Sequence, residues 1–119
     1  MEELVEPLDF ALRNTRVLVR RVAVAAYRRE AIPTSYAALL DDLADATDAM
    51  ADELSTDRLA SAVRDRLVEL GRATARVERT RGLSAEVVLA QIRSLVADLL
   101  AVTGLDPLAA TDLIPLSPE

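Results

Sequence analysis

Apolar side chains recur at helical spacing through most of the chain, and short polar or proline-containing segments separate the runs. The most apolar run covers residues 83–105, where apolar residues occupy most of the circumference of a helix, so we expect neighbours on most of its sides. Its core face consists of Val88, Ile92, Leu95, Leu99 and Val102. The opposite side is built from small residues that would let another helix approach closely: Ala90, Ser94, Ala97 and Ala101.

Local signals mark both ends of this helix. Ser84 is a candidate N-cap, and Leu83 before it could pack against Val88 as a hydrophobic staple. Gly104 suits the left-handed position that follows many helices. Asp106 followed by Pro107 is typical of a cap and a first helical turn, which predicts a short final helix over residues 107–113.

The first predicted helix covers residues 4–30, with Pro7 in its first turn, and shows two apolar faces. The face predicted to enter the core, here named the Val5 stripe, consists of Val5, Leu8, Leu12, Thr15, Val19, Val22 and Ala26, flanked by Ala11, Leu18 and Ala25. The second face, here named the Phe10 face, consists of Phe10, Val17 and Val24, bordered by Arg13 and Arg20. Two interpretations stay open: a contact surface for another chain or for a further part of the same protein, or single exposed apolar residues without a role.

Two further helices are predicted over residues 35–54 and 57–80, with a cap cluster at Ser55, Thr56 and Asp57 between them. Residues 31–57 carry seven acids and no base, whereas residues 58–82 carry seven arginines against three acids, which favours packing of these two helices side by side. Because the connections are short, we predict an all-α, antiparallel up-down-up-down four-helix bundle with a short C-terminal helical turn, forming one domain over residues 1–119. Tyr27 and Tyr36 are expected at the core edge, and Leu113 and Leu116 as anchors of the last segment.

Composition excludes several kinds of chemistry. The chain has no His and no Cys, which removes imidazole acid–base catalysis, thiolate chemistry and the usual zinc ligands. We therefore expect no enzyme, no cofactor and no metal. The net charge of −6 argues against nucleic acid as a partner. No run of apolar residues is long enough to cross a membrane, so the chain as given is expected to be soluble.

Two groups of polar residues are candidate sites. Asp41, Asp45, Asp48 and Asp52 have helical spacing and offer oxygen ligands, but a solvated face explains them better because calcium loops need a turning backbone. Arg66, Gln91, Arg93 and Asp98 lie in or beside apolar faces of two neighbouring helices and could form a buried polar network. That network would bind a small organic anion, or it would only fix the register of the helices, with Arg66 extending to water along its stem.

Two stretches, LVEPLDFALRNTRVLVRR at residues 4–21 and LAQIRSLVADLLAVTGLD at residues 89–106, together resemble the C-terminal region of actinobacterial FUSC family membrane proteins, the fusaric acid resistance-like and aromatic acid exporter-like proteins. The resemblance implies a cytoplasmic fragment of a larger inner-membrane protein. The matching positions, for which packing and capping are the first expectation, are Pro7, Leu8, Asp9, Arg13, Asn14, Arg16, Gln91, Arg93, Ser94, Asp98, Thr103 and Gly104.

The expected function is therefore that of a non-enzymatic domain that assists assembly or regulation of a FUSC-like exporter of aromatic or other organic acids, at the cytoplasmic face of the inner membrane. Its expected partners are the membrane-embedded part of the same protein and a second copy in a homodimer. The alternative is a free-standing helical adaptor or regulatory bundle that binds a protein helix or a small ligand.

Overall fold

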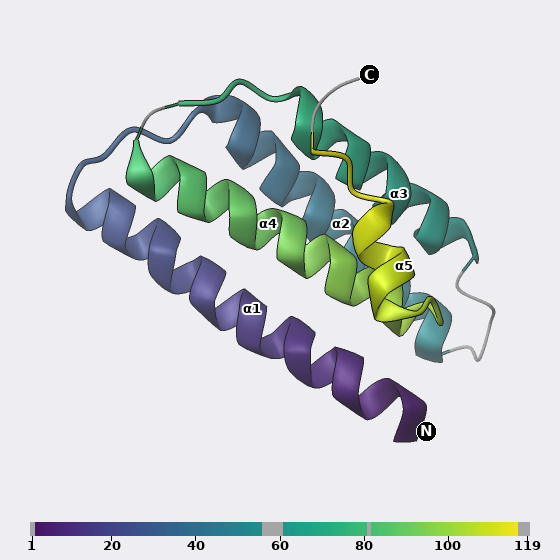
Figure 1. Ribbon diagram of the computed structural model, residues 1–119. Coiled ribbons are helices and arrows are strands. Elements are labelled where there is room, and N and C mark those ends of the chain that lie inside the picture. The colour runs from purple at the N-terminus through teal and green to yellow at the C-terminus, as the bar shows by residue number, and fades with distance from the viewer. Residues whose placement is uncertain (1, 56–60, 81, 117–119) are drawn as a thin grey trace.

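The computed structural model describes residues 2–55, 61–80 and 82–116, and within them it contains helices and no strand. The helices alternate in direction along the bundle (Figure 1), as the short connections predicted. Their bounds are α1 Glu2–Tyr27, α2 Thr34–Ser55, α3 Ser61–Arg76, α4 Leu83–Val102 and α5 Pro107–Asp112. The predicted all-α bundle with a short C-terminal helix is confirmed.

Helix α4 lies at the centre of the molecule (Figure 1) and packs against α1, α2, α3 and α5. Its apolar side chains explain this position: Val88, Ile92, Val96 and Leu100 are each 0% exposed. Full burial of such a side chain is worth about 1.5–3 kcal/mol, so this helix dominates the core. The prediction that residues 83–105 organise the fold is therefore confirmed.

The predicted signals at Gly104 and Asp106, near the C-terminal end of α4, are confirmed. Gly104 follows the helix with a φ of +106°, in the left-handed region, and Asp106 caps α5 by accepting hydrogen bonds from the backbone N–H groups of Leu108 and Ala109. The predicted Ser84 cap is wrong. The helix already begins at Leu83 after Gly82 without a side-chain cap, and the Ser84 hydroxyl donates instead to Glu30. Glu30 lies in the connection between α1 and α2, so a contact with a distant segment replaces the predicted cap.

Helices α2 and α3 pack against each other and both contact α4, as their apolar faces and opposite charges predicted. The buried side chains of α2 are Tyr36, Leu39, Leu43, Ala46 and Met50, and those of α3 include Val63, Leu67, Leu70 and Thr74. Helix α3 ends at Arg76, four residues before the predicted end. Its predicted beginning at Asp57, and most of the predicted cap cluster, lie outside the described residues.

The two tyrosines do not share the core edge. Tyr36 is 1% exposed and its hydroxyl donates to the carbonyl of Glu78 over 2.8 Å, which ties the start of α2 to the α3–α4 connection. Burial raises the pKa of this phenol, and nearby Arg79 partly offsets the rise. Tyr27, by contrast, is 89% exposed at the end of α1, so its predicted place at the core edge is wrong.

Helix α1 buries one flank of the predicted core face and leaves most of the centre of that face exposed. Ala11, Leu18 and Ala25 are turned to the core, whereas Val5, Leu12 and Val19 of the Val5 stripe are 64%, 58% and 62% exposed. Within the described chain α1 packs against α4 and against no other helix, and small alanines let the two helices approach closely. Helix α1 also begins at Glu2, so Pro7 lies inside it and not in the first turn.

The segment after α5 is anchored by Ile114, which is 8% exposed, whereas the predicted anchors Leu113 and Leu116 are 38% and 85% exposed. Ile114 rests on Gly71 of α3, where a β-carbon would come within 3.2 Å of its side chain. The absence of a side chain at Gly71 thus makes room for Ile114, a contact that helical periodicity in the sequence does not reveal.

Candidate interaction surfaces

A polar contact joins α1 to α4 at the middle of their interface. The side-chain amide of Asn14 donates a hydrogen bond to the carboxylate of Asp98, and both residues are partly buried. Burial raises the pKa of Asp98, and the hydrogen bond from Asn14 lowers it in part. The contact fixes the register of α1 on α4, since either polar group alone in this position would lose its water without compensation.

Arg93 on the other flank of α4 holds the C-terminal segment. Its guanidinium donates to the Thr74 hydroxyl over 2.7 Å and to the carbonyls of Ile114 and Pro115 over 3.2 and 2.6 Å. Burial, together with the neighbouring Arg79, lowers the pKa of Arg93. These bonds connect α3, α4 and residues 114–115, so Arg93 serves the fold at this point.

The four residues predicted as a buried polar network are not brought together. Asp98 bonds to α1, Arg93 bonds to α3 and the C-terminal segment, and the buried Oε1 of Gln91 accepts no hydrogen bond from the described residues. Arg66 is exposed. Arg66 directly precedes the buried Leu67, and adjacent residues of a helix do not share a face, so its side chain lies at the exposed edge of α3.

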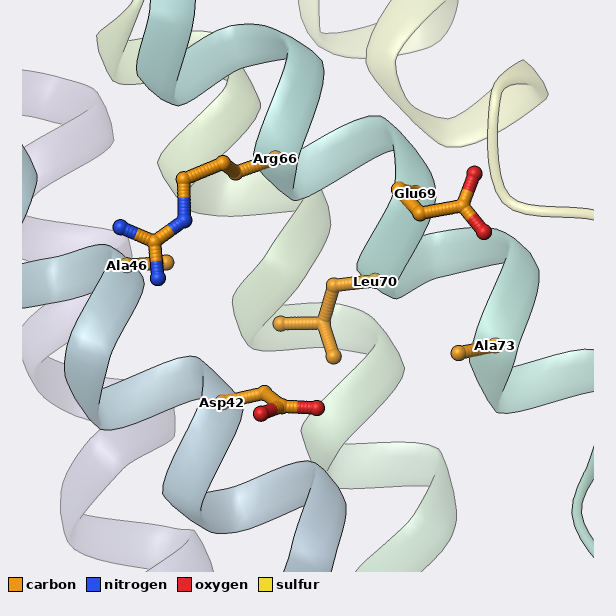
Figure 2. A pocket seen from close by; sticks show the side chains of 6 residues that line it. All are labelled: Asp42, Ala46, Arg66, Glu69, Leu70 and Ala73. Atoms are coloured by element: carbon orange, nitrogen blue, oxygen red, sulfur yellow. The ribbon is translucent and has the colours of Figure 1, made fainter.

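Arg66 lines a shallow pocket of about 250 Å³ between α2 and α3. Figure 2 shows its side chain reaching from α3 toward Ala46 of α2, with Asp42 one turn away on α2 and Leu70 between them. Glu69 points away from this group (Figure 2) and pairs with Arg72 and Arg76 of its own helix. The small open pocket, with one arginine and two carboxylates in its lining, resembles a solvated helix–helix edge more than a ligand site.

The small-residue side of α4 is open between α1 and the C-terminal segment. Ala90 and Ser94 are exposed, and Ala97 and Ala101 are partly buried. Two adjoining hollows follow this side: one of about 800 Å³ between Asn14 and residues 111–116, and one of about 480 Å³ between Phe10, the end of α4 and α5. We predicted that another helix would approach these small residues closely. Within the described chain, no helix occupies that position.

The predicted Phe10 face lies on the surface of α1. Phe10 and Val17 are 45% and 37% exposed, Val24 is partly buried, and Arg13 and Arg20 are exposed beside them. Arg13 forms an ion pair with Asp9 one turn earlier, at 3.0 Å. Phe10 itself lines the hollow beside α5. This face and the Val5 stripe leave α1 with apolar surface on both flanks of its contact with α4.

One contact that was not predicted closes the C-terminal end of α4. Arg64 of α3 donates through its Nε to the Thr103 hydroxyl over 3.0 Å, and the same hydroxyl donates to the carbonyl of Leu100 over 2.6 Å. A cation beside the last turn of a helix also meets the negative end of its dipole. The sequence did not single out Arg64 for this contact, because α3 contains several other arginines.

The acidic stripe of α2 is solvated: Asp41, Asp45, Asp48 and Asp52 are all exposed. Among the described residues, no three carboxylates gather in a way that could hold a metal ion. In the same part of the chain, each helix is too short or too polar to cross a lipid bilayer.

Comparisons with known proteins give one distant relative. No protein-family profile matches the chain, and no solved structure matches it. An uncharacterized protein of Corynebacterium glutamicum is 30% identical over 122 residues, a match that covers 96% of this chain and 31% of the relative. The chain therefore spans about a third of the length of the curated relative it matches.

Proposed function

We propose that this chain is a non-enzymatic cytoplasmic domain of a FUSC-like inner-membrane exporter of aromatic or other organic acids, and that it acts in assembly or regulation through helix–helix contacts. The uncovered apolar surface of α1 carries this proposal. Phe10 and Val17 are large, exposed and on one face of α1, which among the described helices packs against α4 alone. Surface of this kind is typical of a site for another protein segment.

The packing of α1 on α4 supports the resemblance on which the transport role rests. The two stretches that resemble the exporter family fall in these two helices, far apart in sequence and adjacent in space. Asn14 and Asp98, one from each stretch, bond to each other. Thr103 and Gly104 end α4, so these matching positions serve packing and capping. A shared pair of stretches that builds one structural unit is a stronger basis for a resemblance than two unrelated segments.

The length of the relative also supports a role inside a larger protein. A match over 31% of that protein leaves most of it outside the region shared with this chain. A domain that works beside further segments has a reason to keep apolar surface such as the Phe10 face.

The test is made in the source organism with the full-length gene. Deletion should make growth severalfold more sensitive to fusaric acid and other aromatic carboxylates, and the intact gene should restore tolerance. Val17→Asp should restore it only in part at equal protein level, whereas Asp45→Ala on the solvated face of α2 should restore it fully. Recovery of the full-length protein outside the membrane fraction, with tolerance unchanged by deletion, would refute the proposal.

The open side of α4 favours a second candidate, a helical adaptor or regulatory bundle. The hollow of about 800 Å³ beside Ala90 and Ser94 has room for a small ligand or for the side chains of a partner helix. Under this alternative the full-length protein carries no membrane span, and binding to this side of α4 is its activity.

A further inference from the structure

The Val5 stripe is an exposed helix face with the spacing of a helix–helix interface. Val5, Leu12 and Val19 are more than half exposed, at 64%, 58% and 62%, and Leu8 between them is 37% exposed. Single exposed apolar residues are ordinary on protein surfaces. Four of them at helical spacing on one face of one helix are typical of a contact site.

The spacing of the Val5 stripe indicates which kind of partner it can contact. Positions 5, 8, 12, 15 and 19 alternate steps of three and four residues, which is the a/d pattern of a coiled coil. A helix that enters a globular core shows a wider apolar face, and α1 uses Ala11 and Leu18 beside the stripe for that purpose. The narrow stripe is therefore suited to one further helix packed along α1.

We propose that this helix is α1 of a second copy of the chain, packed antiparallel to the first. In this orientation an a position faces a d position, so that Leu8 meets Val19 of the second copy, with Leu12 and Thr15 in the next layer. Val5 lies in the outer layer opposite Val22, which is half-buried against the core of its own chain. Each layer joins residues that complement each other in size, and the stripe needs no other sequence to complete it. The two-fold axis passes between the Leu12–Thr15 layers, as an isologous interface requires.

Charge complementarity supports the second copy and its direction. Asp9 and Arg16 occupy equivalent positions beside the stripe, one heptad apart. An antiparallel pair brings Asp9 beside Arg16 of the other copy on both sides of the axis. The ion pair of Asp9 with Arg13 does not compete strongly, because its two side chains are 54% and 66% exposed. In a parallel pair Asp9 and Arg16 would instead face the flank that holds Ala11 and Leu18, which α1 has turned to its own core.

The dimer does not depend on the transport role, because it concerns residues of this chain alone. Sedimentation of the 119-residue chain over roughly a hundredfold range of concentration should show a monomer–dimer equilibrium, since the dimer population follows mass action. Leu12→Asp should weaken dimerisation at least ~10-fold, because two charges would enter the centre of the interface. Val17→Asp places the same charge on the Phe10 face of the same helix and should leave the equilibrium unchanged.

An exchange of the charges of Asp9 and Arg16 tests whether the two α1 helices are antiparallel. Asp9→Arg and Arg16→Asp should each weaken the dimer severalfold, and the two together should restore it, because each pair of opposite charges is then rebuilt. The chain has no Cys, so any disulfide that forms must join the introduced cysteines. A mixture of the Leu8→Cys and Val19→Cys chains should form the mixed disulfide faster than either symmetric one. A parallel dimer would give the reverse preference.

Three outcomes would overturn the proposal. The first is a wild-type chain that stays monomeric at every concentration. The second is a dimer broken by Val17→Asp and not by Leu12→Asp, which would move the interface to the Phe10 face. The third is a monomer that co-sediments with vesicles of anionic lipid, which would assign the Val5 stripe to a membrane surface. Circular dichroism of each variant verifies that the exposed substitution leaves the helices intact.

Discussion

At the scale of single residues, the partly buried carboxyl of Asp98 has the clearest energetic consequence. Burial raises its pKa more than the hydrogen bond from Asn14 lowers it, so the folded protein binds a proton at Asp98 more tightly than the unfolded chain does. Its contribution to stability is therefore complete below the unfolded pKa and is lost as the pH rises through the raised folded pKa. The carboxylate at neutral pH is tolerated because Asn14 donates to it.

Two substitutions at this contact separate the charge from the hydrogen bond. Asp98→Asn should be at least as stable as wild type at pH 7, and its relative advantage should vanish as the pH falls below the unfolded pKa of the carboxyl. Asn14→Ala should cost about 1–3 kcal/mol at pH 7, because it leaves a partly buried carboxylate without its donor. Urea unfolding of both single variants and the double variant measures the coupling. A loss of stability in Asp98→Asn that grows toward neutral pH would contradict the assigned sign.

The residue-scale predictions from sequence succeeded where the cause was local. Gly104 and Asp106 act through their own backbone and the next few residues, so their roles could be read directly. Ser84 failed because Glu30, fifty-four positions away, competes for its hydroxyl. Arg64 could not be singled out among the arginines of α3, because its partner Thr103 is identified only by the fold.

At the scale of the elements, the rotation of α1 about its axis is the main departure from prediction. Periodicity shows which residues share a face, but α1 has several apolar faces, and the pattern does not say which one meets α4. The alanine-rich face packs against α4 because Ala11 and Ala25 permit a close approach, and Leu18 is the large side chain between them. Val5, Leu12 and Val19 of the Val5 stripe were thereby left exposed.

Truncation of neighbouring residues on α1 tests this rotation. Leu18→Ala should destabilise the protein by about 2–5 kcal/mol, because it removes buried methyl groups from the α1–α4 interface. Val19→Ala, on the exposed stripe, should change the stability of the monomer by less than about 0.5 kcal/mol. Chemical unfolding at low protein concentration, where a dimer does not contribute, makes the comparison. A larger cost at Val19 than at Leu18 would restore the face predicted from sequence.

At the scale of the whole molecule, the central place of α4 followed from composition alone, because a helix with apolar residues around most of its circumference must be surrounded. The small residues of its other side predicted the close approach of another helix, and that side is open in the described chain. Sequence could not show that this side stays uncovered, because that depends on where α1 and residues 111–116 lie relative to each other. Within this domain, the hollow between them is a place where the two candidate functions lead to different measurements.

An aromatic acid should not stabilise this domain. The hollow beside α4 is lined by Glu86, Asp98 and Asp112 against Arg79 and Arg93, and the guanidinium of Arg93 is already bonded to Thr74 and two carbonyls. A carboxylate would therefore meet net negative charge and an occupied arginine. A ligand at a hundred times its Kd adds about 2.7 kcal/mol and raises Tm by several degrees. We expect no rise in Tm with millimolar benzoate or fusaric acid. A saturable rise that Arg93→Lys abolishes would assign an anion site to this hollow and favour the adaptor over a domain that works through helix contacts.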